Sequence, residues 1–312
     1  MWSGLKKFDG DLLKVQMPPA LADMLAGGRL VHSLNIEGEA GTGRTLLALA
    51  LAGAILCEKQ QGPMCGECVQ CQKVLLGAHS DIVLADGSGE SFRKKNVRAL
   101  RAEAYQRPSE GRAKVYIFTD AQNLDKEVQN VLLKVIEEPP DDTFFIFTCD
   151  NRYRLLPTIL SRVVTVRTRA PAREEALRLL KERLPDKPEA ELSRALTLSG
   201  GAPGLAGEIL QDPSAGKRYA AAQKTAEALA RRDACGVMSV LAPWEKKREE
   251  YAALLETVGK LLMTGELREE LSLSAARCIR LREELNRLLD YCESNGYPPL
   301  LSALLAESGR KL

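Results

Sequence analysis

Residues 38–45 carry glycines, a basic side chain and hydroxyls at the spacing of a phosphate-binding loop. They read Gly-Glu-Ala-Gly-Thr-Gly-Arg-Thr, which departs from the pattern G-x-x-x-x-G-K-[ST] only at Arg44. In that pattern the glycines let backbone N–H groups close around phosphates, the lysine reaches the outer phosphates, and the final hydroxyl binds Mg²⁺. Because arginine replaces the lysine, we expect a degenerate nucleotide-binding loop made by Gly38, Gly41, Gly43, Arg44 and Thr45.

The segments around this loop are of the kind that would position it. Residues 34–37 read as a strand that enters the loop, and residues 45–52 read as a buried helix that leaves it. A loop at the N-terminus of a helix favours anions, because backbone N–H groups and the helix dipole point at the ligand. The chain therefore has the frame of a nucleotide-binding ATPase.

Asp120 follows a strand-like run, residues 115–119, at a place where such an ATPase needs two acidic groups. An aspartate there holds Mg²⁺, and a second polar group orients the attacking water. In one register Thr119 takes the aspartate position and Asp120 the water-orienting position. In the other register Asp120 takes the aspartate position and Ala121 follows it. Either register lacks one acidic group, so the catalytic set is incomplete.

Four cysteines within fifteen residues have a spacing that suits a metal ion: Cys57, Cys65, Cys68 and Cys71. Two overlapping C-x-x-C turns and one nearby cysteine supply the four thiolates that tetrahedral Zn²⁺ prefers. Because four protein ligands leave no open coordination position, we expect a structural zinc site. His79 could replace one ligand, although the four thiolates suffice. We expect the remaining cysteines in the core, namely Cys149, Cys235, Cys278 and Cys292.

The composition is that of an ordinary globular protein. Of 312 residues, 45% are hydrophobic and 28% are charged, which suits two or three domains. A net charge of +2 gives no general attraction to nucleic acid. The sequence has no signal-peptide pattern and no apolar run long enough to span a bilayer, so we expect a cytoplasmic protein without a membrane partner. Cysteines in that compartment favour metal binding or free thiols over disulfides.

The order of strand-like and helical segments predicts three domains. Short apolar runs separated by longer segments predict a parallel sheet with helices on both faces; they are residues 34–37, 81–85, 115–119, 143–148 and 163–166. After about residue 168 the sequence is helical. We therefore predict an α/β domain over residues 1–167 with the metal module 57–71 inserted, a small helical domain over 168–212, and a C-terminal helical domain over 213–312.

Two further segments carry a family resemblance. Residues 130–140 read Asn-Val-Leu-Leu-Lys-Val-Ile-Glu-Glu-Pro-Pro, and residues 161–163 read Ser-Arg-Val. They closely resemble the N-A-L-L-K-x-L-E-E-P-P and S-R-C segments of the bacterial clamp-loader ATPases, which are AAA+ proteins. The resemblance covers residues 28–205, including the cysteine module. It implies an AAA+ domain with a parallel sheet, then a helical lid domain, then an all-α collar for oligomerisation.

Within that family, the altered positions favour the delta-prime type of DNA polymerase III subunit over the gamma/tau motor. The loop lysine is replaced by Arg44, and the strand end lacks one acidic group. A sensor arginine expected in the lid falls at Gly204, so a phosphate-clamping guanidinium is absent. The other sensor falls at Thr148 or Cys149. We therefore expect no intrinsic ATPase activity, and ATP binding is doubtful.

The resemblance implies a role for Arg162 and a set of partners. The family's S-R-C arginine is a finger that stabilises charge on a neighbouring subunit's nucleotide. The alternative is a surface arginine at a strand start. The implied partners are the gamma/tau motor and the delta subunit in a hetero-oligomer. The sliding clamp and primed DNA would be reached through the complex.

Two other functions stay open at this point. The chain could be an active, gamma/tau-like ATPase in which Arg44 substitutes for lysine, because arginine keeps its charge and binds phosphate. It could also be a zinc-stapled DNA-binding regulator. A basic run could touch the DNA backbone, although a solvated face is the plainer interpretation; its residues are Arg93, Lys94, Lys95, Arg98 and Arg101.

Overall fold

The computed structural model describes residues 17–28, 30–59, 62–87 and 103–312. Contacts between Cα atoms divide the chain into two compact units, Met1–Arg169 and Ala170–Leu312. The basic run at residues 93–101 lies outside the described residues. The further division of the second unit near residue 212 stays a prediction.

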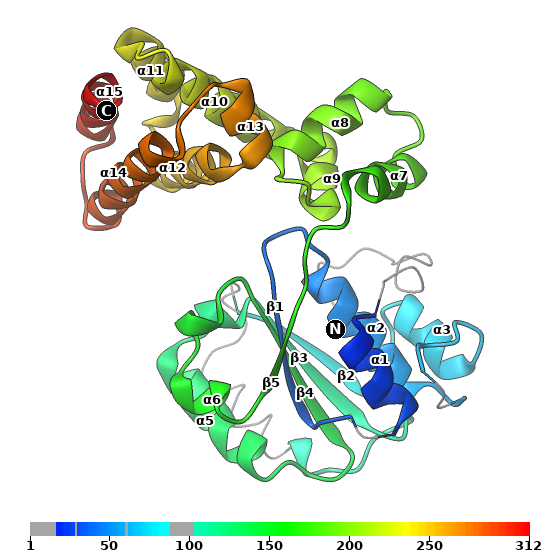
Figure 1. The fold of residues 1–312 in the computed structure, drawn as a ribbon. Helices are drawn as coiled ribbons and strands as arrows, with labels where there is room; N and C mark the ends of the chain where they lie inside the picture. Colours follow the sequence, from blue (N-terminus) through cyan, green and yellow to red (C-terminus); the bar gives the residue numbers. More distant parts are fainter. Residues whose placement is uncertain (1–16, 29, 60–61, 88–102) are drawn as a thin grey trace. The chain divides into compact units, whose positions relative to one another are not determined.

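The first unit contains a five-stranded parallel sheet in the order β2-β3-β4-β1-β5 (Figure 1). Every pair of neighbouring strands is parallel, with Leu34 opposite Ile146 and Ile117 also opposite Ile146 in the central ladders. The predicted α/β fold with a parallel sheet is therefore confirmed. The strands are β1 (Ser33–Glu37), β2 (Ile82–Asp86), β3 (Lys114–Thr119), β4 (Thr143–Cys149) and β5 (Val164–Arg167).

Helices cover both faces of this sheet (Figure 1). Alternate residues of β3 point to opposite faces, so Val115 and Ile117 pack with one set of helices and Tyr116 and Phe118 with the other. The first face is covered by α1 (Pro19–Ala26), α2 (Arg44–Leu56) and α3 (Val69–Leu75). The second is covered by α5 (Lys126–Glu137) and α6 (Pro157–Leu160). Because both faces are buried, β3 and β4 in the middle of the sheet carry continuous apolar runs rather than an alternating pattern.

The carboxyl ends of β1, β3 and β4 meet at one edge of the sheet. Glu37, the last residue of β1, lies opposite Cys149, the last residue of β4. The backbone N–H of Gly38 then donates to the carbonyl oxygen of Cys149 at 3.0 Å, which continues the ladder into the loop. Open parallel sheets bind ligands at this edge. A short 3₁₀ helix follows β3, Ala121–Asn123, and another follows β4, Arg152–Arg154.

The second unit is helical, and its described residues contain no strand. A small cluster of buried side chains joins α7 (Arg173–Arg183), α8 (Glu189–Leu198) and α9 (Pro203–Gln211). A larger cluster joins the remaining long helices. They are α10 (Pro213–Ala230), α11 (Ala234–Leu241), α12 (Arg248–Met263), α14 (Ala275–Glu293) and α15 (Pro298–Lys311), with the short α13 (Gly265–Glu270) and a 3₁₀ turn, Ala242–Trp244. None of the described helices has the length and apolarity to cross a membrane.

Candidate functional site

The loop between β1 and α2 has the backbone conformation that its glycines permit. Gly41 has a φ of 77° and Gly43 a φ of 86°, in the left-handed region that costs other residues energy. Gly43 is the N-cap of α2, so Arg44 is the first helical residue and Thr45 the second. Gly38 has no room for a side chain, since a Cβ atom there would collide with the hydroxyl of Thr168.

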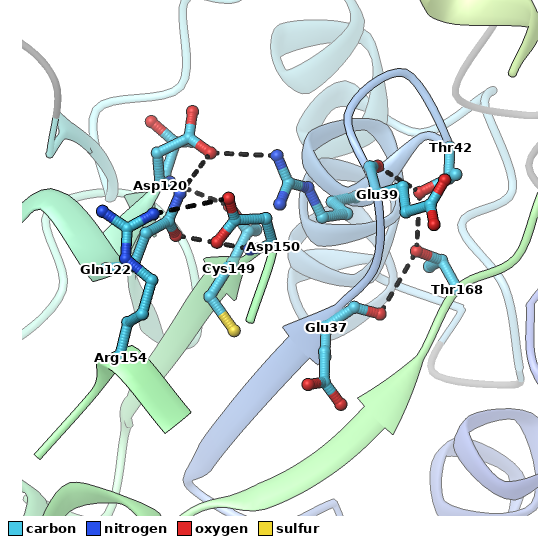
Figure 2. A network of polar contacts seen from close by, with 12 residues as sticks. Glu37, Glu39, Thr42, Asp120, Gln122, Cys149, Asp150, Arg154 and Thr168 are labelled. Atoms are coloured by element: carbon cyan, nitrogen blue, oxygen red, sulfur yellow. Dashed lines mark hydrogen bonds and ion pairs between the residues drawn. The ribbon is translucent and has the colours of Figure 1, made fainter. Parts of the chain in front are cut away.

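Hydrogen bonds within the unit fasten this loop to the end of the sheet (Figure 2). The Thr42 hydroxyl donates to the carbonyl oxygen of Glu39 at 2.7 Å and lies 2.9 Å from the hydroxyl of Thr168. The backbone N–H of Thr168 donates to the carbonyl oxygen of Glu37 at 2.8 Å. The sequence analysis missed Thr168, because no local signal relates two threonines that are 126 positions apart.

Arg44 forms an ion pair with Asp120 across the edge of the sheet. The Nη2 atom of Arg44 lies 2.9 Å from Oδ1 of Asp120, and the arginine side chain is only 10% exposed. Asp120 has a φ of 46° just past the end of β3, and its Oδ1 also accepts from Nε2 of Gln122 at 3.2 Å (Figure 2). The hydroxyl of Thr119 instead turns toward the carbonyl oxygen of Ala85. Asp120 is therefore the residue of this strand end that faces the loop.

This ion pair changes what the loop can do chemically. Mg²⁺ bound to Asp120 would share the carboxylate with a guanidinium, whose permanent positive charge repels the ion. Arg44 does keep some binding capacity, because its Nη1 atom is buried and finds no hydrogen-bond partner within the described residues. The loop thus presents a cation and backbone N–H groups, while its acidic group is already paired.

The residues predicted for the two sensors differ in their contacts. Thr148 accepts a hydrogen bond from the backbone N–H of Asp120 at 3.1 Å, so it faces the site. Cys149 is buried and donates to Oδ1 of Asn35 at 3.3 Å, and burial raises the pKa of its thiol to about 11. Gly204 lies in the first turn of α9 and offers no side chain. Thr148 is thus the residue beside Asp120.

The four cysteines of the predicted metal module converge. Their Sγ atoms all lie within 4.8 Å of one another, and tetrahedral Zn–S bonds of 2.3 Å would place them about 3.8 Å apart. Backbone N–H groups of Cys68 and Glu67 donate to the Cys65 sulfur and lower the pKa of that thiol to about 6. A thiol that ionises readily is a better metal ligand. This cluster can hold a metal ion.

His79 and the four cysteines outside the cluster were also assigned places by the sequence analysis. His79 does not join the cluster, because its Nε2 atom lies 2.8 Å from Oε1 of Gln70 and its Nδ1 atom accepts from the backbone N–H of Asp81. Cys149, Cys278 and Cys292 are buried as predicted. The prediction for Cys235 was wrong: this residue is exposed in the first turn of α11.

Asp81 and Glu110 connect the start of β2 with the segment before β3, and Glu110 also contacts α3 next to the cysteine module. The buried carboxylate of Asp81 accepts backbone N–H groups from Ser109, Glu110 and Gly111 at 2.6–2.9 Å. Burial raises the pKa of Asp81, but these three hydrogen bonds outweigh it and the net direction is downward. Glu110 contacts Lys73 of α3 and Ser80, and these bonds lower its pKa to about 2.

Arg162 lies away from the loop, just after α6. Its Nη1 atom donates to the carbonyl oxygen of Thr158 and to the hydroxyl of Ser161, both at 3.0 Å. Its Nη2 atom lies 2.9 Å from Oε1 of Glu137, and the side chain is 38% exposed. The helix before Arg162, α6, covers one face of the sheet, whereas α2, which begins at the loop, covers the other.

Comparison with known proteins identifies the family. Residues 14–172, just over half of the chain, match a family described as DNA polymerase III, delta subunit. The chain belongs to this DNA polymerase III delta-subunit family. The resemblance inferred from residues 130–140 and 161–163 is thereby confirmed.

Two relatives match this chain over different lengths. DNA polymerase III subunit delta' of Yersinia pestis is 33% identical over 244 residues, which cover 76% of this chain and 70% of that protein. DNA polymerase III subunit tau of Escherichia coli is 31% identical over 180 residues, which cover 57% of this chain and 28% of tau. The identities of 33% to a delta' protein and 31% to a tau protein are too similar to distinguish these two types of subunit. The residues of the loop and of the end of β3 are the better basis for comparing them.

A solved structure also covers nearly the whole chain. It is a gamma-subunit-related protein of DNA polymerase III from Thermotoga maritima, with 18% identity and a TM-score of 0.43, covering 93% of this chain and 98% of that protein. A TM-score of this size does not establish a shared arrangement of whole chains.

We predict that acid destabilises the region around the cysteine module. The folded pKa values of Asp81 and Glu110 lie below their ordinary values, so their stabilisation is present above about pH 5 and is lost as pH falls through the folded values. A Glu110→Gln variant should therefore show a shallower loss of thermal stability between pH 5 and about pH 2.5. Glu174→Gln, the same change at an exposed position in the first turn of α7, is the control, and an equal flattening in it would contradict the assignment.

Proposed function

We propose that this chain is a clamp-loader subunit of the delta-prime type that does not hydrolyse ATP itself and lends Arg162 to a neighbouring motor subunit. The observation that carries the proposal is the Arg44–Asp120 ion pair of 2.9 Å at its own loop. The acidic group at the end of β3 is paired there, while Arg162, just after α6, has a partly exposed guanidinium.

The loss of hydrolysis has a physical basis at three positions. Phosphoryl transfer requires metal ions and cations to neutralise charge on the transferred group. Asp120 is occupied by Arg44, Thr119 turns its hydroxyl away, and Gly204 lacks a side chain. Each change weakens a different part of that machinery, so one substitution would not restore it.

Delivery of Arg162 to another subunit follows from its place in the unit. A planar guanidinium suits bidentate contact with phosphate. Because α6 covers the face opposite α2, the side chain cannot serve the phosphates of its own loop, but it can serve a subunit that packs against this face. The family's S-R-C segment assigns the same role to this arginine.

We propose a matching set of partners. The motor subunit, gamma/tau, would receive Arg162, and the delta subunit would complete the hetero-oligomer, which loads a sliding clamp onto primed DNA in the cytoplasm. Residues 168–212 would form the lid domain and residues 213–312 the collar that joins the subunits. The similarity to both delta' and tau proteins supports membership of one shared assembly.

We propose that the four-cysteine cluster holds structural Zn²⁺. Four thiolates close the tetrahedral coordination sphere, so no position is left for catalysis. The ion would join the end of α2, where Cys57 lies, to α3, which contains Cys71.

We predict ATP turnover below about 0.1 s⁻¹ for the purified chain with Mg²⁺, against the usual range of about 1–10³ s⁻¹ for enzymes. The measurement is steady-state phosphate release, with the motor subunit as positive control. Faster turnover that disappears in Asp120→Asn would show instead an active gamma/tau-like ATPase in which Arg44 replaces lysine.

We predict that Arg162→Ala strongly lowers turnover at the motor site that this chain serves, since fingers contribute on the order of 10³–10⁵ in other systems. The measurement is ATPase activity of the reconstituted complex, with assembly checked by size-exclusion chromatography. Arg154→Ala is the control, because Arg154 is also an exposed arginine in an ion pair. Full activity of an assembled Arg162→Ala complex would remove the finger assignment.

We predict one zinc ion per chain by elemental analysis of the purified protein. Cys68→Ser should lower the zinc content and the melting temperature, because the loss of one ligand opens the coordination sphere. Cys235→Ser, which changes an exposed thiol outside the cluster, should leave both values unchanged. Zinc-free protein with normal stability would exclude a structural zinc site.

A further inference from the structure

The guanidinium of Arg162 is held by two different elements. Thr158 and Ser161, in and just after α6, accept hydrogen bonds from its Nη1 atom. Glu137, the last residue of α5, forms an ion pair with its Nη2 atom at 2.9 Å. Both partners of the ion pair are partly exposed, 38% for the arginine and 45% for the glutamate side chain, so the pair lies at the surface.

The contacts leave one edge of the guanidinium available. An arginine has five N–H donors. Two acceptors engage Nη1 and one engages Nη2, while Nε finds no partner within the described residues. The Nε–H and one Nη2–H of a guanidinium form one edge, which is the arrangement that binds a phosphate with two parallel hydrogen bonds. Glu137 thus contacts the Nη2 atom, and the Nε–H beside it stays available to a phosphate oxygen.

The position of Glu137 is unfavourable for the helix that carries it. The C-terminal end of a helix has a negative partial charge, which disfavours an acidic side chain there. Pro139 and Pro140 follow directly and prevent the helix from continuing. The ion pair with Arg162 supplies a compensating positive charge, so the contact explains why a carboxylate is tolerated at this helix end.

We propose that Glu137 is a positioning residue for Arg162: its carboxylate fixes the guanidinium so that the Nε/Nη2 edge faces the nucleotide of the neighbouring subunit. This inference rests on the proposed function, because it assumes that Arg162 acts in trans. Without the carboxylate, only Nη1 remains tethered, and the guanidinium turns among several orientations. A misplacement of about 1 Å at a reacting group can lower a rate by up to about 100-fold.

The ion pair has little effect on folding, which makes the test feasible. Exposed ion pairs contribute little to stability, so Glu137→Gln should leave the chain folded and assembled. Glu138→Gln is a matched control. It makes the same chemical change one position later, and for Glu138 the described contacts involve only its backbone carbonyl, which accepts from Tyr105.

The experiment measures ATPase kinetics of the reconstituted complex with the wild-type chain and with Glu137→Gln, Glu138→Gln, Arg162→Ala and the double variant Glu137→Gln/Arg162→Ala. We expect Glu137→Gln to lower kcat about tenfold at the served site with KM unchanged. Glu138→Gln should behave as wild type. The double variant should equal Arg162→Ala alone, because Glu137 acts only through the arginine.

The outcomes distinguish the positioning role of Glu137 from the finger role of Arg162. If Arg162→Ala lowers kcat while Glu137→Gln has wild-type kinetics, the positioning role fails and the finger stands. If Glu137→Gln lowers kcat further in the Arg162→Ala background, or if Glu138→Gln is equally impaired, the effect does not run through the ion pair and the inference is overturned. If Arg162→Ala has no effect, the finger assignment falls, and the role of Glu137 falls with it.

Discussion

All strands of the first unit end at the same edge, because the sheet is parallel, and this constraint arranges the rest of the unit. It brings the loop after β1, Asp120 after β3 and Thr148 near the end of β4 into one site. The same sheet separates what lies on its two faces. The helix that starts at Arg44 covers one face, and the segment that carries Arg162 covers the other.

The Arg44–Asp120 ion pair links two departures from an ATPase site. An arginine in place of the loop lysine extends to the strand end, and the acidic residue that would act on metal or water becomes its partner. The pair is mostly buried on the arginine side, where an unpaired charge would be costly. The guanidinium and the carboxylate thus compensate each other's charge, and the loop keeps its glycines beside an aspartate that is already paired.

Arg162 differs from Arg44 because its ion pair lies at the surface. Arg162 also pairs with a carboxylate, Glu137, but at the surface, where the pair costs and contributes little to stability. Its guanidinium keeps an open edge, whereas the guanidinium of Arg44 is enclosed. Arg44 and Arg162 are the same residue type, and they differ in how far each side chain is buried and in which of its N–H groups remain unpaired.

Residue types and spacing alone determined the parallel sheet, the loop glycines, the cysteine cluster and the family, because hydrophobic period, φ requirements and ligand spacing are local properties. They also placed Asp120 at the end of β3. Only the tertiary structure decided that Asp120 pairs with Arg44, that Thr148 rather than Cys149 faces the site, and that Thr168 supports the loop. These contacts join residues that are 28 to 126 positions apart in the sequence. The exposure of Cys235 was also visible only in the folded chain. Such pairings follow from how strands and helices stack, which no local pattern encodes.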